Sequence, residues 1–258
     1  MPIPERLNPT FATARQPDSL DQARQRLIVA LDVPDAPSAA ALVNKLEGAC
    51  HWFKVGLELF TSAGPAVLEP LLNRGHSVFL DLKLHDIPNT VAGAVRSAAS
   101  LGVRMITLHA SGGPAMLAAA QSALYGLPDP PQLLAVTILT SMDASQLTAV
   151  GLSRSPAAQV DLLAKMGFEA GIRGFVCSPQ EVAALRALTG PAGVLVTPGI
   201  RPAAAESPNQ KDDQKRIATP AQALHQGASY LVVGRPITHS PHPAQAAEAI
   251  LKEMAEAL

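Results

Sequence analysis

Short apolar runs recur along the chain, and segments with helical spacing separate them. Each run is nearly continuous in Val, Ile and Leu. This is typical of strands buried on both faces of a parallel sheet and unlike the strict alternation of a half-exposed sheet. The pattern therefore predicts eight buried strands. They are RLIVALD (26–32), WFKVG (52–56), SVFLDLK (77–83), RMITLHA (104–110), LLAVTIL (133–139), GFVCS (174–178), GVLVTPG (193–199) and YLVVG (230–234).

The segments between the runs carry helix start and stop signals. In SPQEVAALRALTG, Ser178 and Glu181 fit a capping box and Pro179 takes the first helical position. Gly190 follows the end of the same segment, as is common after a helix. Comparable patterns predict helices over residues 88–102, 219–227 and 243–257.

Strand and helix alternate from Leu27 to the C-terminus without a shift to linker-like composition. This order predicts an α/β fold, a single-domain (β/α)8 TIM barrel over residues 27–258. Residues 1–26 would form a short N-terminal extension, with a helix starting at Ser19. A doubly wound open sheet is the alternative, but LDVPDAP follows the first strand where such sheets often carry G-x-G-x-x-G. The long connection 199–216 is predicted to be a lid or binding loop.

Composition and charge limit the classes of function. Hydrophobic residues make up 48% of the 258 residues and charged residues 16%, below the roughly 25% of an average domain. A large core is therefore expected. The net charge of −1 provides no broad basic surface for nucleic acid or for an anionic membrane. An anionic ligand must accordingly be bound by a local site.

Two cysteines, Cys50 and Cys177, are too few for a disulfide framework and lack metal-ligand spacing. We expect both to be reduced thiols. The first residues contain no apolar signal-peptide core, and no apolar run reaches the roughly 18 residues of a membrane-spanning helix. We therefore expect a cytoplasmic protein without membrane partners.

Ionisable residues stand at the ends of most predicted strands. In a (β/α)8 barrel these ends meet at one mouth, where active sites are built. The residues are Asp32, Lys54, Asp81, Lys83, His109, Arg201 and Arg235.

The stretch VFLDLKLHDIPNT places charges inside an apolar strand, where burial is costly unless the charge is paired. Asp81 and Lys83 are two apart and should share the barrel interior, while Leu80, Leu82 and Leu84 point toward the helices. For an isolated D-x-K, a structural ion pair at a strand end would be the simpler interpretation. The longer pattern D-x-K-x-x-D, in a chain with a matching Asp32 and Lys54, favours a functional site.

The chemistry of this cluster follows from its charges. A Schiff-base lysine must lose its proton, whereas neighbouring carboxylates stabilise the ammonium form. Lys83 is therefore expected to stay protonated, which suits it to stabilise a developing carbanion and to donate a proton to that carbanion. Asp81 would face a bound anion with like charge, and this repulsion is relieved if the anion leaves.

The last two strands end in TPGIRP and VVGRPI. Barrels often bind phosphate with the loops after these strands. Arg201 and Arg235 offer forked donors, and Gly234 leaves its backbone N–H accessible. The segment DDQKR, with Gln214, lies between them and would close over the ligand; a solvated basic loop is the alternative for the lysines of this region.

Taken together, DLKLHDIPNT, LTSM, TPGIRP, DDQKR and VGRPI occur in an order that resembles the orotidine 5′-phosphate decarboxylase family, from about residue 27 to 240. The resemblance implies decarboxylation of orotidine 5′-phosphate to uridine 5′-phosphate and CO2 in de novo pyrimidine biosynthesis. It also implies a homodimer that uses neither a cofactor nor a metal.

The resemblance further implies roles for individual residues. Lys54, Asp81, Lys83 and Asp86 would form the catalytic network, with Lys83 protonating C6 after CO2 departs. Asp86 and Thr90 would act in the partner subunit's site. Substrate contacts would come from Asp32 and Lys54 at the ribose, Ile87 at the carboxylate, Thr140 and Ser141 at the pyrimidine, and Arg201, Gln214, Gly234 and Arg235 at the phosphate.

Some residues fit the resemblance less well. His242 stands where family members usually have an aspartate. His85 and His109 have no role in the family pattern, and we interpret them as structural histidines. Two other functions remain open: a Mg2+-dependent phosphosugar enzyme on the same barrel, and a non-catalytic nucleotide-binding barrel.

Overall fold

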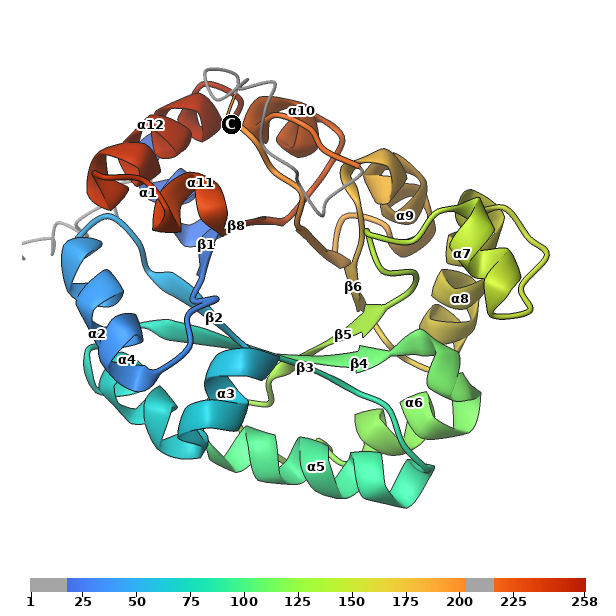
Figure 1. Cartoon of the computed structure of the whole chain (residues 1–258). Coiled ribbons are helices and arrows are strands. Elements are labelled where there is room, and N and C mark those ends of the chain that lie inside the picture. Colours follow the sequence, from blue (N-terminus) through green and yellow to red (C-terminus); the bar gives the residue numbers. More distant parts are fainter. Residues whose placement is uncertain (1–17, 203–215) are drawn as a thin grey trace, which may run out of the picture.

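The computed structural model describes residues 18–202 and 216–258. Its strands pair in parallel and in chain order into a closed barrel, and helices surround the ring (Figure 1). The predicted (β/α)8 TIM barrel is therefore confirmed, and the open sheet was the wrong alternative. The strands are β1 (Leu27–Ala30), β2 (Trp52–Gly56), β3 (Ser77–Leu84), β4 (Met105–His109), β5 (Gln132–Val136), β6 (Gly174–Val176), β7 (Val194–Thr197) and β8 (Tyr230–Val233).

The helices form the outer layer of the barrel (Figure 1). Their bounds are α1 (Ser19–Arg26), α2 (Ala36–Lys45), α3 (Leu57–Ala63), α4 (Glu69–Asn73), α5 (Pro88–Ser100), α6 (Gly113–Ser122), α7 (Ala144–Ala149), α8 (Pro156–Glu169), α9 (Val182–Thr189), α10 (Pro220–His225), α11 (Arg235–Thr238) and α12 (Pro243–Ala255), with 3-10 turns η1 (Pro65–Leu68), η2 (Ala110–Gly112) and η3 (Pro179–Glu181). The segment predicted as one helix after Ser178 thus starts as the turn η3 and continues as α9. No helix among the described residues combines the length and apolarity needed to cross a bilayer.

Two apolar cores lie on opposite sides of the strands. The larger one fills the space between strands and helices and includes Val29, Leu80 and Ile106. The smaller one fills the barrel interior, and its buried members are Ile28, Ala30, Trp52, Phe79, Met105, Leu134, Val196 and Val232. Because successive side chains of a strand point to opposite faces, each strand contributes to both cores, β6 through the half-buried Val176 in the interior. The interior core forms an apolar floor beneath the barrel mouth.

The N-terminal helix α1 belongs to the outer layer. Asp18 caps it by accepting a hydrogen bond from the Asp21 backbone N–H at 2.8 Å, and the helix packs against α12 at the other end of the chain. The helix predicted to start at Ser19 is confirmed. The division of the chain after residue 26 stays a prediction, and residues 1–17 lie outside the described part.

Arg186 of α9 joins the loops that precede β7 and β8. Its guanidinium donates to the Gly190 and Gly193 carbonyls, both at 2.7 Å, and to the Gly227 carbonyl at 2.7 and 3.0 Å. It also donates to Ser229 Oγ at 2.9 Å. Charged donors make the stronger protein hydrogen bonds, so this side chain links two βα units from outside the barrel.

Replacing Arg186 by alanine should destabilise the fold, because the carbonyls of Gly190, Gly193 and Gly227 lose their donor. The expected cost is about 2 kcal/mol, which for a chain of this size lowers the midpoint of thermal unfolding by roughly 5 °C. Differential scanning calorimetry measures this change.

The matched control is Arg154→Ala, since Arg154 is an exposed arginine in the connection between α7 and α8. This variant should unfold within about 1 °C of the unsubstituted chain, as surface substitutions usually do. Equal midpoints for the two variants would contradict the role of Arg186.

Candidate active site

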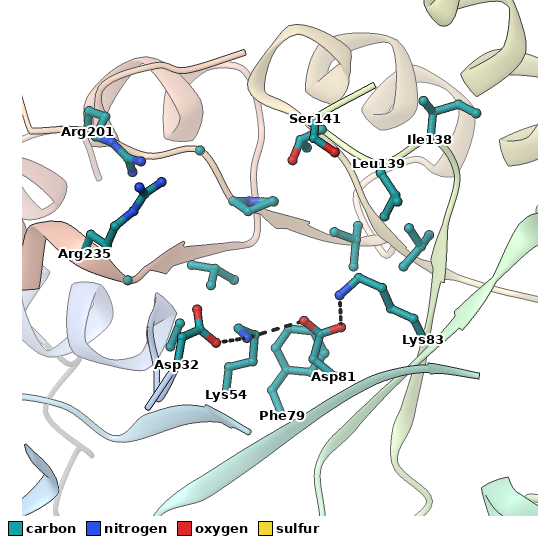
Figure 2. A pocket seen from close by; sticks show the side chains of 18 of the residues that line it. Asp32, Lys54, Phe79, Asp81, Lys83, Ile138, Leu139, Ser141, Arg201 and Arg235 are labelled. Atoms are coloured by element: carbon teal, nitrogen blue, oxygen red, sulfur yellow. Dashed lines mark hydrogen bonds and ion pairs between the residues drawn. The ribbon is translucent and has the colours of Figure 1, made fainter. Parts of the chain in front are cut away.

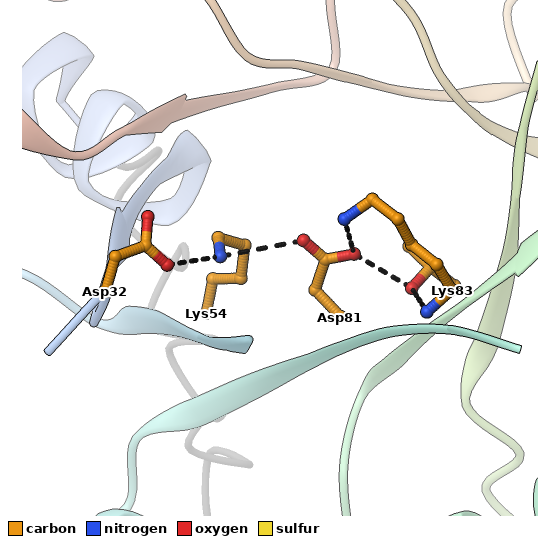
Figure 3. A network of polar contacts seen from close by, with 5 residues as sticks. Asp32, Lys54, Asp81 and Lys83 are labelled. Atoms are coloured by element: carbon orange, nitrogen blue, oxygen red, sulfur yellow. Dashed lines mark hydrogen bonds and ion pairs between the residues drawn. The ribbon is translucent and has the colours of Figure 1, made fainter. Parts of the chain in front are cut away.

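Four side chains of alternating charge form a continuous chain across the barrel mouth (Figure 3). Lys54 Nζ lies 2.8 Å from Asp32 Oδ1 and 3.6 Å from Asp81 Oδ2. Lys83 Nζ contacts the other oxygen of the same carboxylate, Asp81 Oδ1, at 2.8 Å. Each inner charge therefore has a partner of opposite sign on both sides.

Burial and charge oppose each other at the centre of this chain. The side chains of Lys54 and Asp81 are each only 11% exposed. Burial by itself would raise the pKa of Asp81, but the charges of Lys54 and Lys83 and two side-chain hydrogen bonds hold that pKa below its ordinary value. Burial likewise disfavours the ammonium of Lys54, yet Asp81 and Asp32 hold its pKa above the ordinary value. Both groups are therefore charged at neutral pH.

The strand that carries Asp81 and Lys83 is irregular at these residues. Leu80 pairs with Ile106 of β4, but the next pair is Leu84 with Leu108, so residues 81–83 face a single residue of β4. Lys83 has a φ of +51°, the only positive φ of a non-glycine among the described residues. The left-handed region costs an L-residue about 1 kcal/mol or more, and such strain is typical of functional sites.

A cavity of about 550 Å³ opens at this mouth (Figure 2). Arg201 and Arg235 lie on the side of the cavity opposite Lys83. The cavity therefore has a basic end and an end with mixed charge. Its volume lies in the range of small-molecule binding sites. Predicted site residues that line it are Asp32, Lys54, Asp81, Lys83, Thr140, Ser141, Arg201, Gly234 and Arg235.

Three predicted site residues lie elsewhere. Asp86, Ile87 and Thr90 are exposed at and after the end of β3 and do not line the cavity of this chain. Asp86 Oδ1 accepts a hydrogen bond from the Ile87 backbone N–H at 2.6 Å, and Ile87 is 66% exposed. Gln214 lies outside the described residues.

Arg216, the last residue of DDQKR, contacts residues that surround the cavity. Its guanidinium forms an ion pair with the buried Glu181 and donates to the Leu139 carbonyl at 3.2 Å. Glu181 Oε2 also accepts from the Ser178 backbone N–H at 2.8 Å. Because Leu139 lines the cavity, Arg216 ties the connection after β5 to the one between β7 and β8.

The sequence patterns did not identify every residue of the site. Thr107 is fully buried in β4 and hydrogen bonds with both Asp81 and Lys83. Phe79 and His239 line the cavity. Gly56 leaves room for the first ion pair, because a Cβ there would lie 3.0 Å from Lys54 Nζ. Phe79 was the most accessible to sequence reasoning, since it stands two residues before Asp81 on the same strand face.

His85 and His109, the two histidines near Lys83, do not line the cavity. Their rings are tilted against each other with centroids 5.5 Å apart. Burial, followed by the charges of His85 and Lys83, lowers the pKa of His109. Among residues 18–202 and 216–258, no group of three or more His, Cys, Asp or Glu side chains is arranged to hold a metal ion.

Comparison with known proteins places these features in a family. The model of the orotidine 5′-phosphate decarboxylase / HUMPS family matches residues 25–250. A protein named orotidine 5′-phosphate decarboxylase from Moorella thermoacetica is 50% identical over 238 residues, which cover 90% of this chain and 93% of the relative. A protein of the same name from Nostoc sp. is 52% identical over 241 residues, 90% of this chain and 98% of the relative.

Solved structures agree with these sequence relatives. The crystal structure of orotidine 5′-phosphate decarboxylase from Lactobacillus acidophilus superposes with a TM-score of 0.76 and 40% identity, and the match covers 89% of this chain and 98% of that one. With a family model that matches most of the chain and relatives at about half identity, the chain belongs to the orotidine 5′-phosphate decarboxylase / HUMPS family.

Proposed function

We propose that this chain decarboxylates orotidine 5′-phosphate to uridine 5′-phosphate and CO2 in pyrimidine biosynthesis. The observation that carries the proposal is the row of paired charges from Asp32 to Lys83, buried at its two inner members, which faces a cavity with two arginines at its other end. The relatives that are about 50% identical and bear the decarboxylase name support it. The reaction takes place in the cytoplasm and needs no cofactor.

The chemical step requires a proton donor at the reacting carbon. The bond between C6 and the carboxylate breaks, CO2 leaves, and the electron pair stays on C6. Lys83 then gives its ammonium proton to C6 and recovers a proton from solvent. The 2.8 Å contact with Asp81 supports this role, because it fixes the position of the Lys83 amine at the end of the cavity opposite the two arginines.

Asp81 contributes through its charge. It remains ionised despite its burial, so it repels the substrate carboxylate in the ground state and this repulsion disappears as CO2 leaves. Lys54 holds the charge of Asp81 in place and, with Asp32, binds the ribose hydroxyls.

The rest of the cavity binds the other parts of the substrate. Thr140 and Ser141 contact the pyrimidine ring from the connection after β5. Arg201 and Arg235 bind the phosphate, which suits their position at the end of the cavity opposite Lys83. Gly234 offers its backbone N–H to the same phosphate, and Gln214 joins them from the long connection.

Asp86, Ile87 and Thr90 act in a homodimer. None of the three lines the cavity of the chain that carries it, so a role in substrate binding requires a second chain. Asp86 completes the catalytic network of the partner's site, Thr90 binds substrate there and Ile87 lines the pocket for the carboxylate.

Lys83→Ala should lower turnover by roughly 10⁴-fold or more, because both charge stabilisation and proton donation are lost. Binding of uridine 5′-phosphate should be retained, since the phosphate and ribose contacts remain. Steady-state kinetics and calorimetric titration measure the two effects.

Lys165→Ala is the matched control, because Lys165 also pairs with an aspartate, Asp161, at 2.8 Å but on the exposed face of α8. Its turnover should equal that of the unsubstituted chain. Near-normal turnover of Lys83→Ala would refute the proposed proton donor.

Mixing Lys83→Ala with Asp86→Asn subunits should restore activity. Each variant alone has two defective sites per dimer, whereas a mixed dimer has one site without either substitution. With random exchange in an equal mixture, about a quarter of all sites become intact, as expected for a two-fold dimer. Activity is measured after subunit exchange has been demonstrated by mass spectrometry. Exchange without recovered activity would contradict the shared site.

The loss of orotidine 5′-phosphate absorbance should proceed at the same rate with and without EDTA. A metal-dependent member of the same family would instead lose activity on chelation and regain it with Mg2+. Ligand binding without any absorbance change would favour the non-catalytic nucleotide-binding barrel.

A further inference from the structure

The irregular stretch of β3 depends on one side chain of the neighbouring strand. Residues 81–83 face Thr107 alone, between the regular pairs Leu80 with Ile106 and Leu84 with Leu108. Thr107 is fully buried and does not line the cavity. It therefore lies beneath the charged residues without access to a bound ligand.

The hydroxyl of Thr107 bonds to both residues that carry the proposed chemistry. It accepts a hydrogen bond from the Lys83 backbone N–H at 2.9 Å and donates one to Asp81 Oδ1 at 2.9 Å. A hydroxyl has a single proton to donate, and here the carboxylate receives it. The same carboxylate oxygen also accepts the bond from Lys83 Nζ at 2.8 Å.

We infer that Thr107 is a positioning residue for decarboxylation, whose single hydroxyl sets the backbone of Lys83 and the carboxylate of Asp81 in their working geometry. This inference rests on the proposed role of Lys83 as proton donor. In a regular strand the Lys83 backbone N–H would donate to a backbone carbonyl of a neighbouring strand. Here the Thr107 hydroxyl accepts that hydrogen bond instead, and this stabilises the left-handed conformation of Lys83. Small displacements of a reacting group cost large factors in rate.

A purely structural threonine would affect stability but not the titration of Asp81. The groups that face Asp81 are Lys54 from β2, Lys83 from β3, and Thr107 and His109 from β4. Burial raises the pKa of Asp81, while the two lysine charges and the hydrogen bonds lower it. Removing the Thr107 hydroxyl therefore raises this pKa, and the acid limb of the rate profile moves to higher pH.

The test compares Thr107→Val, which keeps the shape and removes the hydroxyl, with Thr107→Ser, which keeps the hydroxyl. The single-turnover rate of Thr107→Val should fall about 10- to 100-fold, with the Kd for substrate within about threefold. Its acid limb should move to higher pH, while Thr107→Ser should stay within about threefold of the original rate. The control Thr197→Val alters another fully buried barrel threonine, whose hydroxyl lies 3.9 Å from Cys177 Sγ, and should change neither rate nor pH profile.

An unchanged rate and pH profile in folded Thr107→Val would overturn the inference, and so would equal losses in the valine and serine variants. If Thr107→Val does not fold, Thr107→Ser and Thr107→Ala provide the same comparison, because both lack the methyl group and only serine keeps the hydroxyl. Lys83→Ala, measured in the same assay, distinguishes failure of the proposed proton donor from failure of the inferred role of Thr107. An inactive Lys83→Ala beside a fully active Thr107→Val refutes only the role of Thr107.

Discussion

The carboxylate of Asp81 is the group on which the rest of the site depends. A buried carboxylate is tolerated only when it is paired and hydrogen-bonded, and its partners here come from three adjacent strands. Lys54 belongs to β2, Lys83 to β3 and Thr107 to β4. This set of partners therefore comes together only when β2, β3 and β4 pair in the observed register.

The same arrangement explains why an irregular strand persists inside an otherwise regular barrel. A regular β3 would pair residue by residue with β4, and Lys83 would not need a left-handed backbone. The unfavourable conformation is offset by the surrounding ladder and by the hydrogen bond from its N–H to Thr107. Strain held by a rigid scaffold keeps charges in place before a ligand arrives, which is how preorganised sites avoid reorganisation during the reaction.

The two ends of the cavity have different roles in the proposed reaction. Arg201 and Arg235 lie at one end of the cavity, and Asp81 and Lys83 lie at the other. In the proposed reaction, the arginine end binds the phosphate and the end with Asp81 and Lys83 faces the bond that breaks. Binding energy at a remote phosphate can offset an unfavourable contact at the reacting carbon. This separation accounts for a costly charge cluster inside a barrel with an apolar interior floor.

The order of strands and helices, the two faces of each strand and the meeting of charged strand ends follow from the sequence, because side-chain periodicity is a local property of the chain. Asp32, Lys54, Lys83 and Arg235 could be assigned to one mouth on that basis. The break opposite Thr107, the positive φ of Lys83 and the link between Arg216 and Leu139 could not. These features join residues that are distant in sequence, and they are decided by the register and packing of the closed barrel, which no local pattern encodes.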